Sequence, residues 1–152
     1  MRIRAGIVLI QNGSVALIER HRAGLHYFVF PGGGVDEGES PEQAAIREAL
    51  EELGVEVVIK QKVAIVHLGQ KSRQVYFLAE QVGGVFGTGI GEEYTSSDPN
   101  SPDEGSYVPI WMPIEQIPLH EKIYPVELAK LVIKSVREGW GNTNAVFFEE
   151  TQ

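Results

Sequence analysis

The stretch from Gly33 to Val55 reads GGVDEGESPEQAAIREALEELGV and decides how the rest of the chain is interpreted. It opens in a glycine-dense segment and continues into SPEQ at residues 40–43. A hydroxyl at the N-cap, a proline at the first helical position and a glutamine three residues after the cap are typical of a capping box. Strong helix formers follow, and Gly54 suits the left-handed residue that ends a helix. We therefore expect a helix of about three turns after a glycine-rich turn.

Charged and apolar residues separate on this expected helix when its side chains are placed at about 100° per residue. One arc carries the charged residues Arg47, Glu48, Glu51 and Glu52. The opposite arc, which is expected to face the core, carries the apolar residues Ala45, Ile46, Ala49, Leu50 and Leu53. Carboxylates three and four residues apart each destabilise an isolated helix by a few tenths of a kcal/mol, roughly. One guanidinium cannot neutralise three of them, whereas a divalent cation can.

An all-oxygen set of ligands favours Mg²⁺ or Mn²⁺ over zinc. A solvated acidic face is the common alternative, but the adjoining glycines let a backbone approach a ligand closely. Because Mg²⁺ keeps open positions for phosphate oxygens and water, such a site suits hydrolysis of a phosphoanhydride. The 21 acidic and 13 basic residues give a formal net charge of −8, which would repel polyphosphate if no metal were bound. We expect a divalent cation to be required.

Gly33, Glu39 and the run from Arg47 to Val55 together resemble the Nudix box, G-x5-E-x7-R-E-U-x-E-E-x-G-U, in which U is aliphatic. Every fixed position fits, with the small Ala49 at the first U. The resemblance implies an α/β/α sandwich with a mixed central sheet, an α/β (α+β) fold. It also implies a hydrolase in which water attacks a nucleoside diphosphate linked to another group, with Mg²⁺ or Mn²⁺ required.

The same resemblance implies roles for individual residues. Glu51 and Glu52 correspond to metal ligands, helped by the carbonyl of Gly32, and Glu48 corresponds to a ligand or to the general base. Arg47 corresponds to the partner that orients the glutamates. Supporting positions, close to the metal or its water, fall to Gly33 and Glu39. The helical arc supports only a shared face and leaves the choice between ligand and base open.

Further candidates lie outside the box. Glu92, Glu93 and Asp98 are acids in a segment rich in Gly, Ser, Asp and Pro, and we favour Glu93 as an extra acid of the site. Arg20 and Arg22, with His26 close by, precede the box and are candidates for phosphate contacts. Solvated surface charge is the alternative for all of them. Tyr27, Phe28 and Phe30 are expected in the core, and Trp111 either stacks on a base or packs.

The rest of the chain predicts one domain over residues 1–152. Strands are expected at 2–10 and 15–20, joined by a tight turn at Asn12-Gly13, and at 27–30, 55–68, 74–80 and 107–112. Residues 21–26 are expected to be a loop, and residues 82–106 are expected to be either one long loop or a loop broken by a short strand. Pro125 opens a second helix that ends near Gly139, with apolar residues through Val136 on a buried face. The sequence does not assign the tail at 140–152 to a helix or a strand. We expect this tail either to pack on a second copy of the chain, as a homodimer, or to fold back on its own chain.

Composition excludes several classes of function. The absence of cysteine removes disulfides, thiolate metal sites and cysteine nucleophiles, and with them an isoprenoid diphosphate isomerase that depends on cysteine. A net charge of −8 disfavours long nucleic acids and anionic membranes as partners. No apolar run approaches the roughly 20 residues that span a bilayer, so we expect a cytoplasmic protein.

We therefore predict a Mg²⁺- or Mn²⁺-dependent Nudix pyrophosphohydrolase that acts on a nucleoside di- or triphosphate or on a nucleoside diphosphate-linked compound. A noncatalytic nucleotide-sensing or partner-binding module on the same scaffold is the alternative, although a pure binder would not need the intact glutamates. The sequence leaves open the substrate, the phosphorus that is attacked, the number of metals and the identity of the general base.

Overall fold

The computed structural model describes residues 1–89 and 105–149. In chain order, the described elements are β1 (Arg2–Gln11), β2 (Ser14–Arg22), β3 (Leu25–Val29), β4 (Gly32–Gly34), α1 (Pro41–Leu53), β5 (Val55–Leu68), β6 (Ser72–Gly84), β7 (Ser106–Pro113), the 3₁₀ helix η2 (Ile114–Leu119), β8 (Ile123–Tyr124), α2 (Val126–Glu138) and β9 (Ala145–Glu149). None of the helices in this part of the chain has the length and apolar character needed to cross a bilayer.

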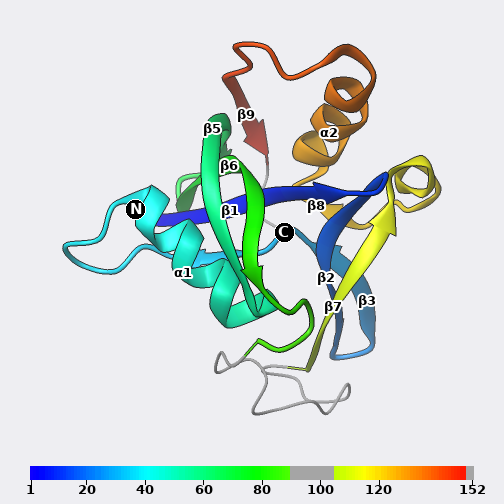
Figure 1. The fold of residues 1–152 in the computed structure, drawn as a ribbon, viewed down its shortest axis with the longest axis horizontal. Coiled ribbons are helices and arrows are strands. Elements are labelled where there is room, and N and C mark those ends of the chain that lie inside the picture. Colours follow the sequence, from blue (N-terminus) through cyan, green and yellow to red (C-terminus); the bar gives the residue numbers. More distant parts are fainter. Residues whose placement is uncertain (90–104, 150–152) are drawn as a thin grey trace.

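The strands form a mixed sheet that is curled (Figure 1). Its order is β8-β3-β2-β1-β6-β5-β9, with β4 paired to β1 and β7 paired to β2. The pairs β1–β6, β5–β9 and β3–β8 are parallel, and the others are antiparallel. Strands β1 and β2 pair only beside their hairpin turn, at Ile10–Val15 and Gln11–Ser14. The two halves of the sheet therefore diverge, and β4 enters between them.

A helix covers each face of the sheet, which confirms the predicted α/β/α sandwich. Ala5, Ile7 and Leu9 of β1 pack in the cluster that contains the buried alanines of α1. The alternate residue Val8 packs in the other cluster, with Leu128 and Val132 of α2. This division follows from the period of two along a strand. Figure 1 shows α1 and α2 on opposite sides of β1.

Helix α1 begins and ends where the sequence predicts. The Ser40 hydroxyl accepts a hydrogen bond from the Gln43 backbone N–H, and the Gln43 side-chain oxygen accepts one from the Ser40 backbone N–H. At the other end of the helix, Gly54 has a φ of 80°. The predicted apolar face is wrong in part, because Ile46 and Leu50 are 39% and 45% exposed. Buried positions are instead Ala44, Ala45, Ala49, Glu52 and Leu53. The small alanines bring the helix close to the sheet, and β4 supplies a hydrogen-bond donor that makes burial of Glu52 favourable.

The loop predicted at 21–26 is also wrong. Strands β2 and β3 continue to a two-residue turn at Ala23-Gly24, with φ values of 51° and 80°, and His21 pairs with His26 across the hairpin. Alanine at a positive φ gives no sequence signal for such a turn. The turn predicted at Asn12-Gly13 is confirmed, and so are the strands predicted at 55–68 and 74–80, which pair with each other as the antiparallel hairpin β5–β6. In α2 the predicted buried face is correct at Leu128 and Val132 and wrong at Val136, which is exposed.

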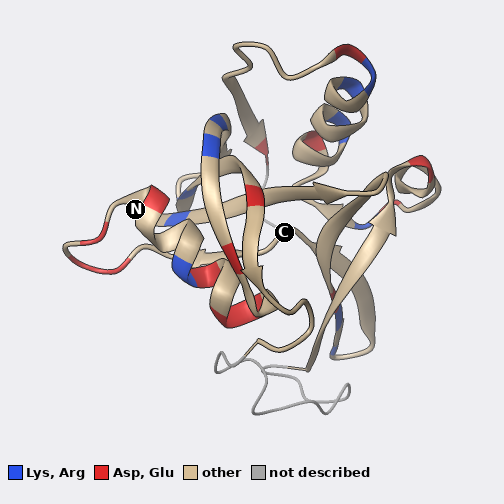
Figure 2. Cartoon of the chain, in the orientation of Figure 1, with Lys and Arg blue, Asp and Glu red and all other residues tan. Residues whose placement is uncertain are grey.

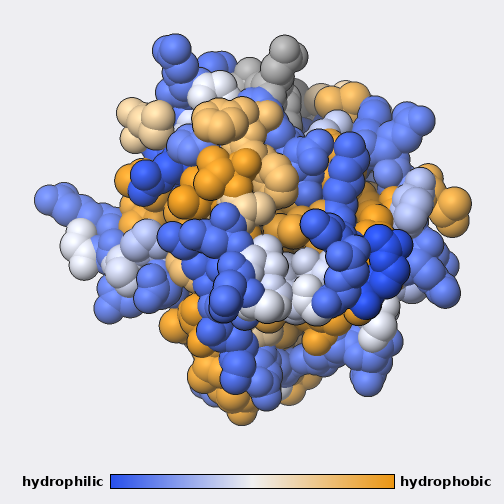
Figure 3. Space-filling view, turned by 90° about the horizontal axis from the view of Figure 1, so that it is seen from above, coloured by the Kyte–Doolittle hydropathy of each residue, from blue (hydrophilic) through white to orange (hydrophobic). Residues whose placement is uncertain are grey.

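The tail folds back on its own chain through β9, which pairs in parallel with β5. The carboxylate of Glu149 accepts from the backbone N–H groups of Val126 and Glu127 at 3.3 and 3.0 Å, and so caps α2. Seen from above in Figure 3, apolar patches interrupt a largely hydrophilic surface. Val146 and Phe148 of β9 are among the exposed apolar side chains. A homodimer, the other arrangement expected for this tail, stays a prediction.

Candidate active site

The end of α1 lies against strand β4 because glycine removes the side chains between them. The Gly32 backbone N–H donates to Glu52 Oε1 at 2.7 Å. A Cβ on Gly33 would lie well inside contact distance of Oε1 and Cδ of Glu48, and 2.8 Å from its Oε2. The carboxyl groups of Glu48 and Glu52 are therefore held beside a backbone that only glycine makes accessible.

Arg47 organises the other carboxylates of the site. Its Nε donates to Glu39 Oε2 at 2.9 Å, and its Nη1 donates to Glu48 Oε1 at 2.9 Å and to Glu51 Oε2 at 3.1 Å. Its Nη2 donates to the Gly34 carbonyl at 2.9 Å, which ties α1 to β4. Figure 2 shows the acidic residues gathered along α1 and the loop before it. One guanidinium thus offsets much of the repulsion that the sequence predicts on this helix.

The ion pairs of Arg47 move two pKa values. Hydrogen bonds from Arg47 and from the Asp36 backbone N–H lower the pKa of Glu39 below its ordinary value. Hydrogen bonds to Glu39 and Glu48 raise the pKa of Arg47 further above its already high value, although burial opposes the rise. Both groups are therefore charged at neutral pH. Arg47 and Glu39 form a fixed frame from which Glu48 projects.

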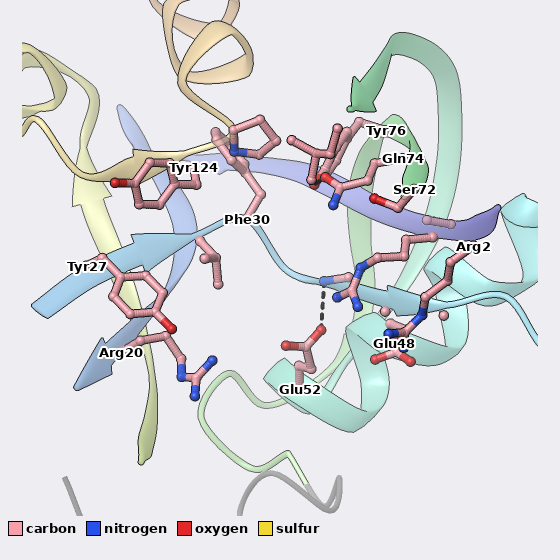
Figure 4. A pocket seen from close by; sticks show the side chains of 18 of the residues that line it. Arg2, Arg20, Tyr27, Phe30, Glu48, Glu52, Ser72, Gln74, Tyr76 and Tyr124 are labelled. Carbon is pink, nitrogen blue, oxygen red and sulfur yellow. Dashed lines mark hydrogen bonds between the residues drawn. The ribbon is translucent and has the colours of Figure 1, made fainter. Parts of the chain in front are cut away.

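A pocket of about 650 Å³ opens beside this frame (Figure 4), and Gly32, Gly33, Glu48 and Glu52 form part of its lining. On one side lies what we call the tyrosine wall: Arg20, Arg22, Tyr27, Tyr107 and Tyr124. On the other lies what we call the β1–β6 wall: Arg2, Arg4, Lys71, Ser72 and Gln74. Five cationic side chains thus line one pocket of a chain whose net charge is −8.

On the tyrosine wall, Arg20 is stacked and hydrogen bonded. Its Cζ lies 3.6 Å from the centroid of the Tyr107 ring and 5.7 Å from that of Tyr27. Its Nε donates to the Ser106 carbonyl at 3.1 Å. The residues 20, 27 and 107 meet because they are cross-strand partners in β2, β3 and β7. The wall therefore presents aromatic rings and a fixed guanidinium on the same face of the sheet.

The structure brings most of the predicted residues together. Gly32, Gly33, Glu48, Glu52, Arg20 and Arg22 all line the pocket. Glu39 and Glu51 contact Arg47 instead, and the Glu51 side chain is 38% exposed. Glu93, with Glu92 and Asp98, lies outside the described residues.

Other residues lie where the sequence reasoning did not place them. Tyr27 lines the pocket rather than the core. Trp111 packs, which is one of the two roles predicted for it, and its ring stacks on Phe86 at 4.5 Å between ring centroids. His26 lies outside the pocket lining, with its Nε2 2.7 Å from Glu19 Oε2. Glu19, His21 and His26 offer ligand atoms that all lie within 4.8 Å of one another. This nitrogen-containing group differs in chemistry from the carboxylates of α1, and strand alternation puts it on the other face of the hairpin from Arg20.

The donor chemistry of the α1 site fits a hard divalent cation. Its side-chain donors are carboxylate oxygens, and the backbone of β4 lies close to them because its three residues are glycines. Mg²⁺ and Mn²⁺ prefer such oxygen ligands. Glu48, Glu51, Glu52 and the Gly32 carbonyl are the residues that would hold the ion.

The comparisons with known proteins agree with this arrangement. The NUDIX domain profile matches residues 1–131. RNA pyrophosphohydrolases of Vibrio cholerae serotype O1 and Tolumonas auensis are each 49% identical over 55 residues, which is 36% of this chain. Those 55 residues are 31% and 30% of the two proteins, so the match spans less than a third of these relatives.

Solved structures share the fold at low sequence identity. A NUDIX hydrolase from Nitrosomonas europaea superposes with a TM-score of 0.72 at 19% identity and covers 99% of this chain and 79% of its own. An ADP-ribose pyrophosphatase from Streptococcus suis gives 0.66 at 17% identity, over 96% and 98% of the two chains. With the profile match over most of the sequence and the glutamates in place beside the glycine strand, the chain belongs to the Nudix family.

Proposed function

We propose that this chain is a hydrolase that depends on Mg²⁺ or Mn²⁺ and cleaves a pyrophosphate linkage in a nucleotide substrate. One observation carries the proposal: Glu48 and Glu52 line a pocket that also contains five cationic side chains and several tyrosines. Carboxylates suit the metal, cations suit phosphate, and aromatic rings suit a base. The noncatalytic alternative explains the cations and rings but not the retained glutamates.

Some residues of the pocket bind the substrate, and others take part in the hydrolysis. Arg20 and Arg22 bind phosphate oxygens, and Tyr27 and Tyr107 offer ring faces to a base. When bound, the metal polarises the phosphate and lowers the pKa of a coordinated water. Glu48 either binds the metal or takes the proton of the attacking water, and Arg47 holds it in position. One P–O bond forms to water oxygen, and the P–O bond to the leaving phosphate breaks.

A small nucleotide in the cytoplasm is the substrate that we favour, with the catalytic unit spanning residues 1–152 as one domain. The 5′ end of an RNA is the second candidate. The named activity of the relatives that are 49% identical over 55 residues favours it. Both substrates present a short phosphate chain to the same pocket. The two candidates differ in the part behind the phosphate chain, which is a single nucleoside in one and an RNA strand in the other.

A substrate panel tests the proposal. The protein is incubated with Mg²⁺ or Mn²⁺ and with nucleoside triphosphates, nucleotide sugars, dinucleoside polyphosphates and a 5′-triphosphate RNA, in ¹⁸O-labelled water. We expect metal-dependent turnover, with label in the phosphate that water attacks. Glu52→Gln should abolish turnover and weaken Mg²⁺ binding, whereas Glu42→Gln, on the same helix, should retain both. Absence of turnover on every compound, or full activity of Glu52→Gln, would contradict the proposal.

A further inference from the structure

We propose that the β1–β6 wall is a second anion subsite, which receives a phosphate-bearing group on the side of the cleaved linkage away from the tyrosine wall. The inference rests on the proposed function and specifies its substrate class. The ligand expected is a nucleotide that continues beyond the cleaved linkage into further phosphates or a phosphorylated group. A nucleotide whose second half is an uncharged sugar does not use this wall.

The backbone register places the polar side chains of this wall on one face. In the parallel pair β1–β6, Arg2 is the partner of Ser72, and Arg4 is the partner of Gln74. Residues two apart on a strand share a face, so the four side chains point the same way. The Arg2 backbone N–H donates to the Lys71 carbonyl at 3.0 Å, which fixes Lys71 beside them. Four of the five residues of the wall therefore lie on the paired strands β1 and β6, and Lys71 lies in the turn just before β6.

The three cations of this wall have no carboxylate partner in the part of the chain that the structure describes. Arg2, Arg4 and Lys71 form no ion pair there within 4.0 Å, although Arg47 nearby pairs with four acids. Three like charges on adjoining residues repel one another. In a chain with 21 acidic residues, local carboxylates could have relieved that repulsion. A bound anion offsets it at this position instead.

The neutral groups of the wall also suit an anion. Ser72 and Gln74 are buried, and both line the pocket. The Tyr76 hydroxyl donates to Gln74 Oε1 at 2.7 Å. With its oxygen engaged, the Gln74 amide presents its NH₂ group to the pocket, as Figure 4 shows. The wall thus offers guanidinium, ammonium, hydroxyl and amide donors, which is the set that a phosphate accepts from.

The two walls differ in the ligand group that they can hold. Tyr27, Tyr107 and Tyr124 are on the tyrosine wall, whereas the nearest ring to the β1–β6 wall is Tyr76, which is buried and whose hydroxyl is bonded to Gln74. In Figure 4, Glu48 and Glu52 lie between Arg20 on one side and Arg2 on the other. A base therefore fits one side of the glutamates and a charged phosphate group fits the other. The substrate is therefore oriented with its base at the tyrosine wall and its further phosphates at the β1–β6 wall.

Pyrophosphate binding without metal tests the subsite independently of turnover. Titration calorimetry with inorganic pyrophosphate in EDTA compares the wild type with Arg2→Ala/Arg4→Ala and with Lys60→Ala/Lys134→Ala, which removes the same charge from exposed positions outside the pocket. We expect the arginine pair to weaken binding by about tenfold or more and the lysine pair by less than about twofold. Lys71→Ala is the second variant, with thermal unfolding as the check that each protein folds. Equal losses in both double variants, or no loss in either, would overturn the subsite.

The substrate arm compares a nucleoside triphosphate with a nucleotide sugar that has the same base. We expect kcat/KM to favour the triphosphate, and Arg2→Ala/Arg4→Ala to lower that preference by about tenfold, because the loss of kcat/KM falls more heavily on the triphosphate than on the nucleotide sugar. Turnover with no such preference and no change in the variant refutes the subsite and leaves the proposed function intact. Loss of pyrophosphate binding in the arginine variant of a protein that hydrolyses nothing supports the subsite and refutes the proposed function.

Discussion

Replacement of Gly33 by alanine should separate the geometry of the glutamates from the stability of the fold. Gly33 has no positive φ, so alanine fits its backbone conformation. The added Cβ would overlap Oε1 and Cδ of Glu48 and lie 2.8 Å from Oε2, against the 3.4 Å of ordinary contact. The Glu48 carboxyl must move by about 1 Å, and a misplacement of that size at a reacting centre costs on the order of 100-fold in rate.

The expected result is a fall in kcat/KM of about 100-fold with a weaker affinity for Mg²⁺, since the same displacement breaks the 2.9 Å bond between Arg47 and Glu48. Stability should change little, because the displaced group is the end of a side chain. The matched control is Gly34→Ala, whose Cβ would meet the flexible end of Arg2, at 3.4 Å from Nη2 and 3.8 Å from Nε. Steady-state kinetics, Mg²⁺ titration and thermal unfolding measure the three quantities. Wild-type kinetics in Gly33→Ala would refute the argument that the glycine positions Glu48.

Three further predictions concern the supports of the site. Ser40→Ala removes the capping hydroxyl of α1 and should lower the free energy of unfolding in urea by about 1 kcal/mol, whereas Ser40→Asp should retain it. The pKa of Glu39 is lowered in the folded state, so its contribution is present above its ordinary value of 4.5 and is lost as pH falls through the lowered pKa. Glu39→Gln should therefore flatten the acid limb of stability against pH, and an unchanged limb would contradict the pairing with Arg47. Glu149→Ala leaves two backbone N–H groups of α2 uncapped and should lower the free energy of unfolding by about 1 kcal/mol in the same urea assay. Glu138→Ala, at the other end of α2, is the control and should leave that free energy nearly unchanged.

Short-range signals account for the parts of the fold that sequence reasoning predicts correctly. The capping box at Ser40, the left-handed Gly54 and the turn at Asn12-Gly13 each depend on a few adjacent residues. The exposure of Ile46 and Leu50 depends on a contact that spans 20 residues, from the Gly32 N–H to Glu52. A helical wheel treats a glutamate as a surface residue and cannot include a donor from another element. For that reason the predicted core face of α1 is rotated from the observed one.

The same distinction explains which parts of the site were found. The Nudix box predicts Glu48, Glu52 and the glycines because its fixed positions all lie within one short stretch of sequence. Arg2 and Arg4 were missed because their neighbours Ser72 and Gln74 are about 70 residues away and join them only through the parallel pairing of β1 with β6. Two arginines separated by one residue near the start of a strand have no distinctive local pattern. Topology, rather than composition, makes them part of the pocket.

Net charge and pocket charge act on different ligands. A total of −8 governs the approach of a long polyanion, which must touch the acidic surface outside the pocket. Under the proposed function, a short phosphate chain instead meets Arg2, Arg4, Arg20, Arg22 and Lys71, which outnumber the two carboxylates in the pocket lining, those of Glu48 and Glu52. We therefore expect the protein to select substrates by the length of their charged segment. It favours a free nucleotide over the body of an RNA, and it leaves the triphosphate end of an RNA able to bind if the bases behind it remain outside the pocket.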